Sequence, residues 1–269
     1  MASPRVTKRI LHATAWLFVL YLAVAYVALP LAWTHHDRQP AIANLSMRTH
    51  TEQGIPADPI NVGAIGAHET LLLAFAKAGW TPADPITLMS SLAIAESVVL
   101  HRPDSRAPVS SHYFDGRKQD FAFEKQVGGS AAQRHHIRFW KALETGSEGK
   151  PLWLASATFD RGVGLSRFTG QITHHTDPDI DAERDFVIDD LTHAGVVGDI
   201  YEITGSGTTL HARNGEGDPY FTDGEVKMVV LKDEAPESQT APLRMASPTY
   251  VARKRLLFDA YRSLRRWIL

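Results

Sequence analysis

The sequence predicts an α+β fold: a single domain with one mixed or antiparallel sheet and a few packed helices, behind one N-terminal transmembrane helix. Three observations predict this architecture. Residues 13–33 form one uncharged apolar run, short segments beyond residue 57 have the length and alternation of strands, and segments with helical spacing lie among them. Strands joined mainly by hairpins, with helices interspersed, are typical of the α+β class.

The apolar run over residues 13–33 has the length of a membrane-spanning helix. At about 1.5 Å of rise per residue it reaches about 30 Å, the thickness of a bilayer core. Three of residues 5–9 are basic, whereas only Arg38 follows the run closely. This bias predicts a single-pass protein of the inner (cytoplasmic) membrane, with residues 1–12 in the cytoplasm and the main domain extracytoplasmic.

Two other interpretations of the run remain open. A cleaved signal peptide would need a small-x-small site, which Ala41-Ile42-Ala43 provides, although the apolar core of a signal peptide is usually about 7 to 15 residues long. A buried helix of a soluble protein is the second alternative. An uncleaved anchor fits the length of the run best.

The composition is that of a globular protein, with 44% hydrophobic and 22% charged residues. The absence of cysteine excludes disulfides, thiolate metal sites and a cysteine nucleophile. A net charge of -2 gives no argument for a nucleic acid partner, and none is expected. Histidine is the enriched residue type, at 13, and many of the histidines fall in pairs.

Composition also divides the chain beyond the anchor. Residues 34–56 are predicted to be a linker, 57–235 one folded domain, 236–249 a second linker and 250–269 a basic amphipathic helix. That last segment has six arginines and lysines against one aspartate, and its apolar residues share one helical face. Such a helix suits a membrane surface, so a lipid surface is a predicted partner. The alternative is a helix packed on its own domain with its arginines in solvent.

The pattern of apolar residues gives the order of elements inside the domain. The predicted strands cover residues 58–66, 119–127, 134–140, 151–159, 170–176, 196–203 and 224–231. The predicted helices cover residues 68–79, 86–100 and 178–193. The segment 212–224 contains an Asn-Gly pair and several glycines, which predicts a loop or hairpin.

The strand RHHIRFW (134–140) carries the most suggestive charged side chains. Alternation places His135, Ile137 and Phe139 on one face, and Arg134, His136 and Arg138 on the other. If the neighbouring strands are adjacent in the sheet, the second face meets Asp160 and one histidine of the pair at 174 and 175 across a cleft. The candidate anion-binding residues are Arg134, Arg138, Arg161 and Arg167, and the candidate catalytic residues are His136, His175 and Asp160.

Arginine forks bind phosphate, and a histidine among them can transfer protons, so this set suits a phosphoester or another anionic ligand. The alternative is that these side chains form charged pairs on the surface of the sheet, and that His135 lies in the core with its hydrogen bonds satisfied.

The segment HHTDPDIDAERD (174–185) combines imidazoles with many carboxylates. This is a ligand set for zinc, manganese or iron, and it makes a divalent metal a candidate cofactor. The candidate metal ligands are His174, His175, Asp177, Asp179 and Asp181. The alternative is helix capping, with Asp177 as N-cap, proline at the first helical position and acidic residues in the first turn.

The loop RNGEGDPYFTDG is unusually rich in turn-forming and polar residues for a simple connection. Glycine-rich loops can bind anions, but no P-loop or dinucleotide fingerprint is present. The composition of this segment therefore predicts a turn, and a further role in binding stays open.

Seven segments occur together and in this order: DPINVGAIG, AGWTPADPIT, RAPVSSHYFDGRKQDFAFEK, RHHIRFW, ATFDRGVGLS, TGQITHHTDPDIDAERDF and RNGEGDPYFTDG. As a set they resemble the LssY C-terminal domain family of bacterial envelope-associated proteins, over roughly residues 57–232. The resemblance implies a bacterial membrane setting and the domain boundaries given above. It implies no activity, cofactor or catalytic residue, because none is established for the family.

Three functional hypotheses follow. The first is a membrane-anchored envelope domain that binds an anionic component, such as a phospholipid headgroup or a lipid-linked phosphate. The second is a metal-dependent hydrolase acting on a phosphoester, so whether the protein is an enzyme stays open. The third is a non-catalytic adaptor of a secretion or membrane-enzyme complex, whose partner would be an integral membrane or secretion protein.

Overall fold

The computed structural model describes residues 4–28, 42, 44–83, 111–127, 133–146, 149–165, 172–233, 241–247 and 249–268. The chain divides into two compact units. The first unit combines Met1–His36 with Pro248–Leu269, and the second is Asp37–Ser247. The predicted helix over residues 86–100 lies outside the described residues.

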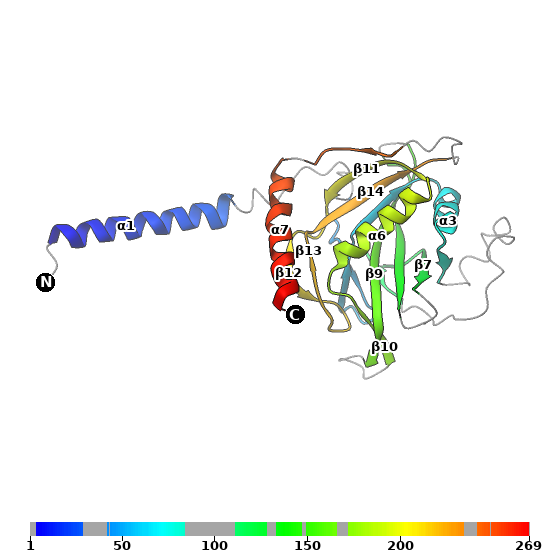
Figure 1. Cartoon of the computed structure of the whole chain (residues 1–269), viewed down its shortest axis with the longest axis horizontal. Helices are drawn as coiled ribbons and strands as arrows, with labels where there is room; N and C mark the ends of the chain where they lie inside the picture. Colours follow the sequence, from blue (N-terminus) through cyan, green and yellow to red (C-terminus); the bar gives the residue numbers. More distant parts are fainter. Residues whose placement is uncertain are drawn as a thin grey trace. The chain divides into compact units, whose positions relative to one another are not determined.

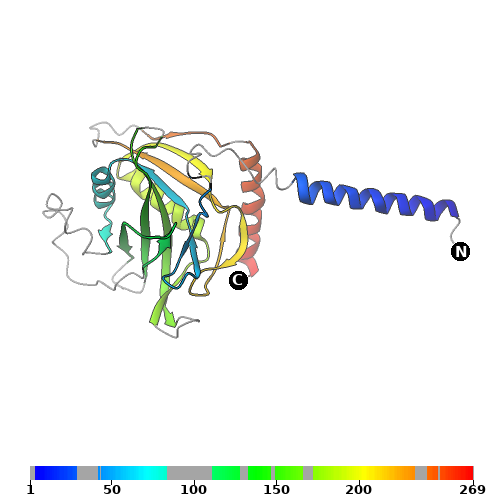
Figure 2. The same ribbon diagram turned by 180° about the vertical axis from the view of Figure 1, so that it is seen from behind.

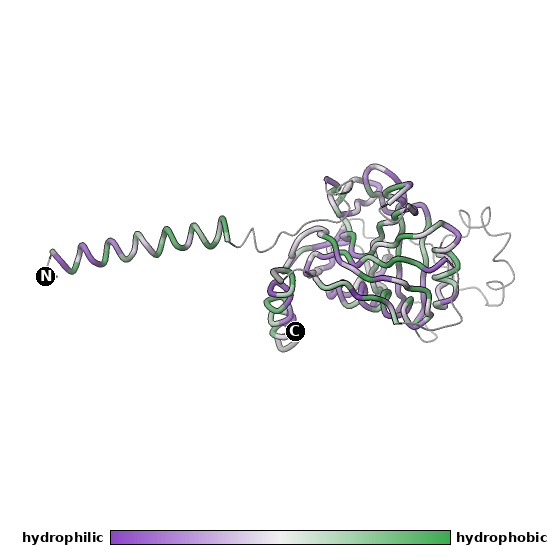
Figure 3. The backbone as a smooth tube through the Cα atoms, turned by 90° about the horizontal axis from the view of Figure 1, so that it is seen from above, coloured by the Kyte–Doolittle hydropathy of each residue, from purple (hydrophilic) through white to green (hydrophobic). Residues whose placement is uncertain are grey.

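The first unit consists of helices. Helix α1 (Pro4–Ala23) continues into the π-helical turn η1 (Val24–Ala28), and α7 (Thr249–Ile268) is the C-terminal helix. Figure 3 shows hydrophobic residues along the later part of α1. Over Arg5–Ala28 the helix is long and apolar enough to cross a membrane, a property that anchors share with signal sequences. It begins earlier than the predicted anchor 13–33, whose last residues lie outside the described part of the chain.

The second unit is built on a mixed sheet, which confirms the predicted α+β class. Among the described residues nine strands form this sheet, in the order β15-β11-β14-β3-β9-β8-β7-β4, with β10 paired to β9. Two pairs are parallel (β14 with β3, and β11 with β15), and the others are antiparallel. The strands are β3 (Val62–Ile65), β4 (Thr81–Pro82), β7 (Phe121–Gln126), β8 (Arg134–Leu143), β9 (Leu152–Leu165), β10 (Ile172–Thr176), β11 (Val197–Thr204), β14 (Glu225–Leu231) and β15 (Leu243–Arg244).

Helices α3 (His68–Lys77) and α6 (Ile180–His193) cover one face of this sheet, and Figure 1 shows α6 lying across it. The apolar stripes of both helices, including Phe75 and Val187, join Ile137, Phe139 and Ala155 of the sheet in one buried core. Burying a large apolar side chain contributes about 1.5–3 kcal/mol, so this layer is a main source of stability.

The opposite face carries a second core and a smaller sheet (Figure 2). Trp140, Leu154 and Met228 of the large sheet pack there with Met47 and Phe114. The small sheet has the order β2-β1-β5-β6, and β12 and β13 form a separate hairpin. These strands are β1 (Arg48–His50), β2 (Pro56–Pro59), β5 (Tyr113–Phe114), β6 (Arg117–Lys118), β12 (Thr209–Arg213) and β13 (Pro219–Thr222).

The strand expected over residues 58–66 is divided between the two sheets, since its first part belongs to β2 and its second to β3. Asn61 lies at the break. Its side chain accepts a hydrogen bond from the Ala157 amide at 2.9 Å and donates to the carbonyls of Ala157 and Ile180 at 2.9 and 3.2 Å. A buried amide that replaces ladder bonds in this way lets the chain change sheets without unpaired backbone groups.

Candidate functional site

A polar cavity of about 70 Å³ lies on the face of the large sheet that carries the smaller sheet. Strands β8, β9 and β10 form its floor, and the loop between β12 and β13 lines it as well. Thr51, His174 and Glu216 stay partly exposed, so the cavity is open to solvent on their side. The lining residues are Thr51, Ala57, Asp58, His112, Arg134, His136, Arg138, Thr158, Asp160, His174, Thr176, Asn214, Gly215 and Glu216.

Strand alternation explains why three charged or titratable side chains of β8 meet there. Arg134, His136 and Arg138 all line the cavity, and Ile137 points into the core on the other face, as the sequence predicts. Strand β9 pairs with β8 so that Asp160 lies opposite Arg134. The register therefore places a carboxylate beside the arginine and the histidine.

His136 and Asp160 form a close pair. Nε2 of His136 lies 2.8 Å from Oδ2 of Asp160, and His136 is 3% exposed. Burial lowers the pKa of His136 to about 4, against the raising effect of Asp160, so the imidazole is neutral at pH 7. Burial would raise the pKa of Asp160, but the hydrogen bond and charge of His136 outweigh it and lower that pKa.

Arg134 is buried and held by two carboxylates. Its Nη1 donates to Glu124 at 3.1 Å, and its Nε donates to Asp160 at 3.4 Å. Nη2 lies 3.3 Å from Nδ1 of His174, which comes from β10. The guanidinium thus joins four strands at one end of the cavity.

Arg138, Asp58 and His112 form the other end. Burial lowers the pKa of Arg138, and burial raises that of Asp58 although Arg138 opposes the rise. Oδ1 of Asp58 accepts a hydrogen bond from Asn214 at 3.3 Å, and its Oδ2 lies 3.8 Å from Nδ1 of His112. Burial, with Arg138 nearby, lowers the pKa of His112 well below its usual value.

The loop between β12 and β13 lines one side of the cavity, and its own side chains fix its conformation. Oδ1 of Asn214 accepts from the amide of Asp218 at 3.0 Å, and its Nδ2 donates to Thr176 at 3.0 Å. Asp218 accepts from the amide of Thr176 at 3.1 Å and contacts Nδ1 of His175 at 2.7 Å. The polar loop noted in the sequence is therefore a wall of the cavity.

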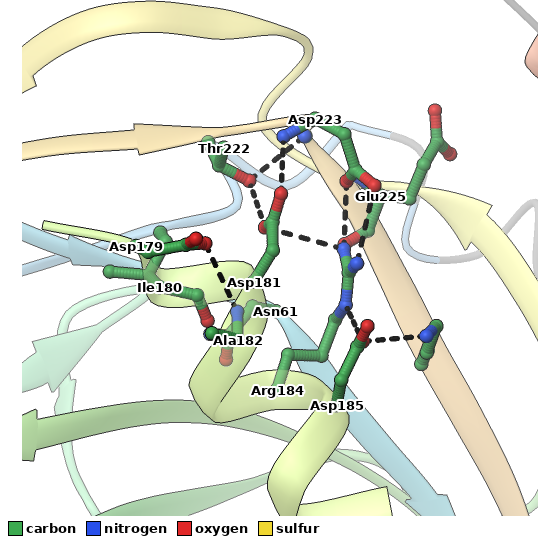
Figure 4. A network of polar contacts seen from close by, with 12 residues as sticks. Asn61, Asp179, Ile180, Asp181, Ala182, Arg184, Asp185, Thr222, Asp223 and Glu225 are labelled. Carbon is green, nitrogen blue, oxygen red and sulfur yellow. Dashed lines mark hydrogen bonds and ion pairs between the residues drawn. The ribbon is translucent and has the colours of Figure 1, made fainter. Parts of the chain in front are cut away.

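A buried ionic network fixes this hairpin to the start of α6 (Figure 4). Asp181 accepts from Thr222 and from the amide of Asp223, both at 2.7 Å. Arg184 donates to Asp223 at 2.7 Å and to the carbonyl of Glu225 at 3.0 Å. Burial raises the pKa of Asp181 to about 6, whereas the charges of Asp223, Asp181 and Asp185 outweigh burial and raise that of Arg184. The network is structural and positions the hairpin wall.

The five candidate metal ligands have separate partners. His174 faces Arg134, His175 contacts Asp218, and Asp181 bonds to the residues of β13 described above. Asp177 accepts from the amide of Asp179 at 2.9 Å, and Asp179 accepts from that of Ala182 at 3.2 Å. In the part of the chain that the structure describes, no group of three or more His, Asp or Glu side chains is arranged to hold a metal ion.

Asp179, not Asp177, is the N-cap of α6, and the helix begins at Ile180 instead of Pro178. Asp177 instead forms the turn that precedes the cap. The acidic residues of this segment thus act in capping, although through a different residue from the one expected.

The remaining candidate residues lie elsewhere. Arg161 is exposed and does not line the cavity, and Arg167 lies outside the described residues. His175 does not line the cavity and contacts Asp218 instead. His135 is in the core on the helix face, where its Nδ1 lies 2.7 Å from Glu183 and its ring stacks on Phe186.

Sequence reasoning missed Asp58 and His112, which complete the cavity, and gave Asn214 no definite role. Asp58 lay inside a predicted strand and His112 directly follows a long loop, so neither carried a signal of function. The turn-rich composition around Asn214 was the one available hint. These residues meet Arg138 through contacts distant in sequence.

A model of a protein family described as the LssY C-terminus matches residues 42–226, more than half of the 269-residue chain. The match spans every residue that lines the cavity. No curated protein and no solved structure matches the chain.

Proposed function

The chain belongs to the LssY C-terminus family, and from this premise we propose that it is a membrane-anchored domain whose cavity binds an anionic envelope component. The ligand group is a phosphate, carried by a phospholipid headgroup or by another lipid-linked phosphate. The observation that carries the proposal is the pair of buried arginines, Arg134 and Arg138, that line one solvent-open cavity.

Both arginines are pre-positioned for a planar or tetrahedral anion. A guanidinium has five N–H donors, so one that already binds a carboxylate can donate to a second anion as well. Thr158 adds a neutral hydroxyl to the same lining. A cavity of about 70 Å³ holds a group of the size of a few water molecules, so it suits a phosphate and not a whole lipid.

The carboxylates that line the cavity repel an incoming anion. This repulsion becomes weaker when a carboxylate is protonated. Burial raises the pKa of Asp58, so this carboxyl takes up a proton more readily than an exposed one. Protonation removes a negative charge beside Arg138. We therefore expect anion binding to strengthen as the pH falls.

The two terminal helices support the membrane setting. The helix over Arg5–Ala28 is long and apolar enough to be the anchor. The basic residues that precede its apolar part favour a cytoplasmic N-terminus and an extracytoplasmic domain. In α7 the leucines 256, 257 and 264 are 69%, 62% and 62% exposed, beside the exposed Arg253. Exposed leucines on a basic helix suit the surface of a bilayer that contains anionic lipids.

Titration calorimetry of the full chain in detergent micelles with inorganic phosphate tests the cavity. Arg138→Gln should weaken binding about tenfold or more, since a hydrogen bond to a charged group contributes about 1.5–3 kcal/mol. Arg161→Gln, on the exposed arginine, is the matched control and should leave the affinity unchanged. Equal weakening in both variants, or no binding by the wild type, would contradict the proposal.

The lipid surface is tested by a label on α7, because the chain has no cysteine of its own. An environment-sensitive dye on Ser263→Cys, in nanodiscs, should shift to the blue when phosphatidylglycerol replaces part of the phosphatidylcholine. The same dye on Thr145→Cys, an exposed loop position, is the control. A label on Ser263→Cys that responds no more than the control would rule out the surface contact.

A further inference from the structure

Both ring nitrogens of His136 are buried, and neither has a hydrogen bond of good geometry among the described residues. Nε2 lies 2.8 Å from Oδ2 of Asp160, whereas Nδ1 has no such neighbour in the described part of the chain. Leaving a buried polar atom unpaired costs about 1–3 kcal/mol. Because His136 lines the cavity, a water molecule or ligand there can supply the missing partner.

The carboxylate beside Nε2 decides which ring nitrogen of His136 carries the proton. A negative charge 2.8 Å from Nε2 favours the tautomer with the proton on Nε2, and Nδ1 then keeps its lone pair and can accept a hydrogen bond. A carboxylate that orients an imidazole in this way is the arrangement of a general base and its positioning residue. Arg134 contacts the same Asp160 oxygen at 3.4 Å and keeps the carboxylate in place.

We infer that the cavity hydrolyses a phosphate monoester, with His136 as general base and Asp160 as the residue that positions it. Nδ1 of His136 takes a proton from a water molecule, the water oxygen bonds to phosphorus, and the bond between phosphorus and the ester oxygen breaks with its electron pair on that oxygen. The leaving oxygen takes a proton from Asp58, and His136 returns its proton through solvent to Asp58. The products are inorganic phosphate and an alcohol, and one water is consumed.

This inference rests on the proposed anion binding, because the arginines that bind the phosphate also stabilise the charge that develops on it. Asp58 is suited to donate a proton, since it lines the cavity, is 5% exposed, and burial raises its pKa. The opening beside Thr51 and Glu216 leaves room outside the cavity for the alcohol portion of the substrate.

The test measures release of phosphate by the full chain in detergent micelles from two monoesters, para-nitrophenyl phosphate and phosphatidic acid. Binding of inorganic phosphate is measured in parallel. His136→Gln should lower kcat at least about 100-fold, the usual contribution of a general base, and leave the phosphate affinity within about threefold. His193→Gln, at the exposed end of α6, should leave both quantities unchanged.

The variant Asp160→Asn tests whether Asp160 positions His136, and it distinguishes this role from an effect on folding. Asp160 raises the pKa of His136, so its removal should lower kcat and also move the acid limb of the pH profile of kcat to lower pH. If the variant were less active only because it folds poorly, kcat would fall by the same factor at every pH and the acid limb would stay at the same pH.

The outcomes separate the two proposals. Turnover of either ester confined to variants that keep His136 supports hydrolysis, and preference for one ester distinguishes a lipid substrate from a soluble one. Phosphate binding with no turnover of either ester, or turnover that survives in His136→Gln, overturns hydrolysis and leaves anion binding intact. Absence of both binding and turnover overturns both.

Discussion

Oδ2 of Asp160 lies 2.8 Å from Nε2 of His136, and the two residues come from neighbouring antiparallel strands. The same oxygen lies 3.4 Å from Nε of Arg134. One carboxylate thus holds an imidazole and a guanidinium at the edge of a single cavity. We propose that this arrangement binds, and acts on, an anionic group.

Acid should destabilise the protein partly through His136. The folded-state pKa of about 4 lies below the ordinary 6.5, so the unfolded chain binds the proton more tightly. Stability is therefore present above pH 6.5 and is lost as the pH falls towards 4, by at most about 3 kcal/mol for this group. Thermal unfolding followed by circular dichroism should show a smaller loss between pH 6.5 and 4 in His136→Gln than in the wild type.

The comparison of variants matters because Asp181, with its pKa raised to about 6, changes stability in the opposite direction as the pH falls. His193→Gln is the control and should keep the wild-type pH dependence. Identical curves for the wild type and His136→Gln would mean that this histidine is not buried in its neutral form.

The network at the start of α6 should be a large contributor to stability. Arg184→Met leaves Asp181 and Asp223 buried without their guanidinium, which should cost about 3–5 kcal/mol in urea unfolding. Arg244→Met, which removes an exposed ion pair with Asp189 at 3.8 Å, is the control and should cost about 1 kcal/mol or less. Equal losses in both variants would contradict the role given to the buried network.

Anion affinity should depend on the charge of Asp58. With sulfate as the probe, wild-type affinity should rise as the pH falls, because protonation of this carboxyl removes a repulsive charge. Asp58→Asn should bind sulfate more tightly than the wild type at pH 7.5 and show a flatter pH dependence by calorimetry. Weaker binding by Asp58→Asn would mean that the carboxylate supports the site instead of opposing the anion.

The orientation in the membrane can be measured directly because the chain contains no cysteine. A membrane-impermeant maleimide should label Thr145→Cys in cells with a permeabilised outer membrane, and label Thr7→Cys only after the inner membrane is lysed. The reverse pattern would place the domain in the cytoplasm. Loss of the first residues from the mature protein would identify the apolar helix as a cleaved signal.

Much of the sheet was predictable because its alternation is strong. In β8 the apolar positions 137 and 139 point into the helix-covered core, and this alone directs Arg134, His136 and Arg138 to the other face. The sequence left open whether this strand and the one after it are adjacent, and the structure pairs them. Local pattern was sufficient wherever one face of a strand is apolar.

The rest of the site was not predictable because it depends on contacts distant in sequence. Asp58 reaches the cavity only because the chain changes sheets at Asn61, and a continuous strand was expected there. The acidic segment 174–185 has the composition of a metal site, yet its carboxylates cap a helix and bond to β13. The composition of a segment shows which side chains are present, but their contact partners depend on how the chain packs in the folded protein.

Anion binding beside His136 can be followed by ¹⁵N NMR of the full chain labelled on its histidines, with the His136 signals assigned by their loss in His136→Gln. Addition of inorganic phosphate should shift the Nδ1 resonance of His136, because His136 lines the cavity and its Nδ1 has no hydrogen-bond partner among the described residues. The shift should saturate, and Arg138→Gln should require about tenfold more phosphate. An Nδ1 signal that does not move, while phosphate binding is detected by calorimetry, would place the anion elsewhere and contradict the account.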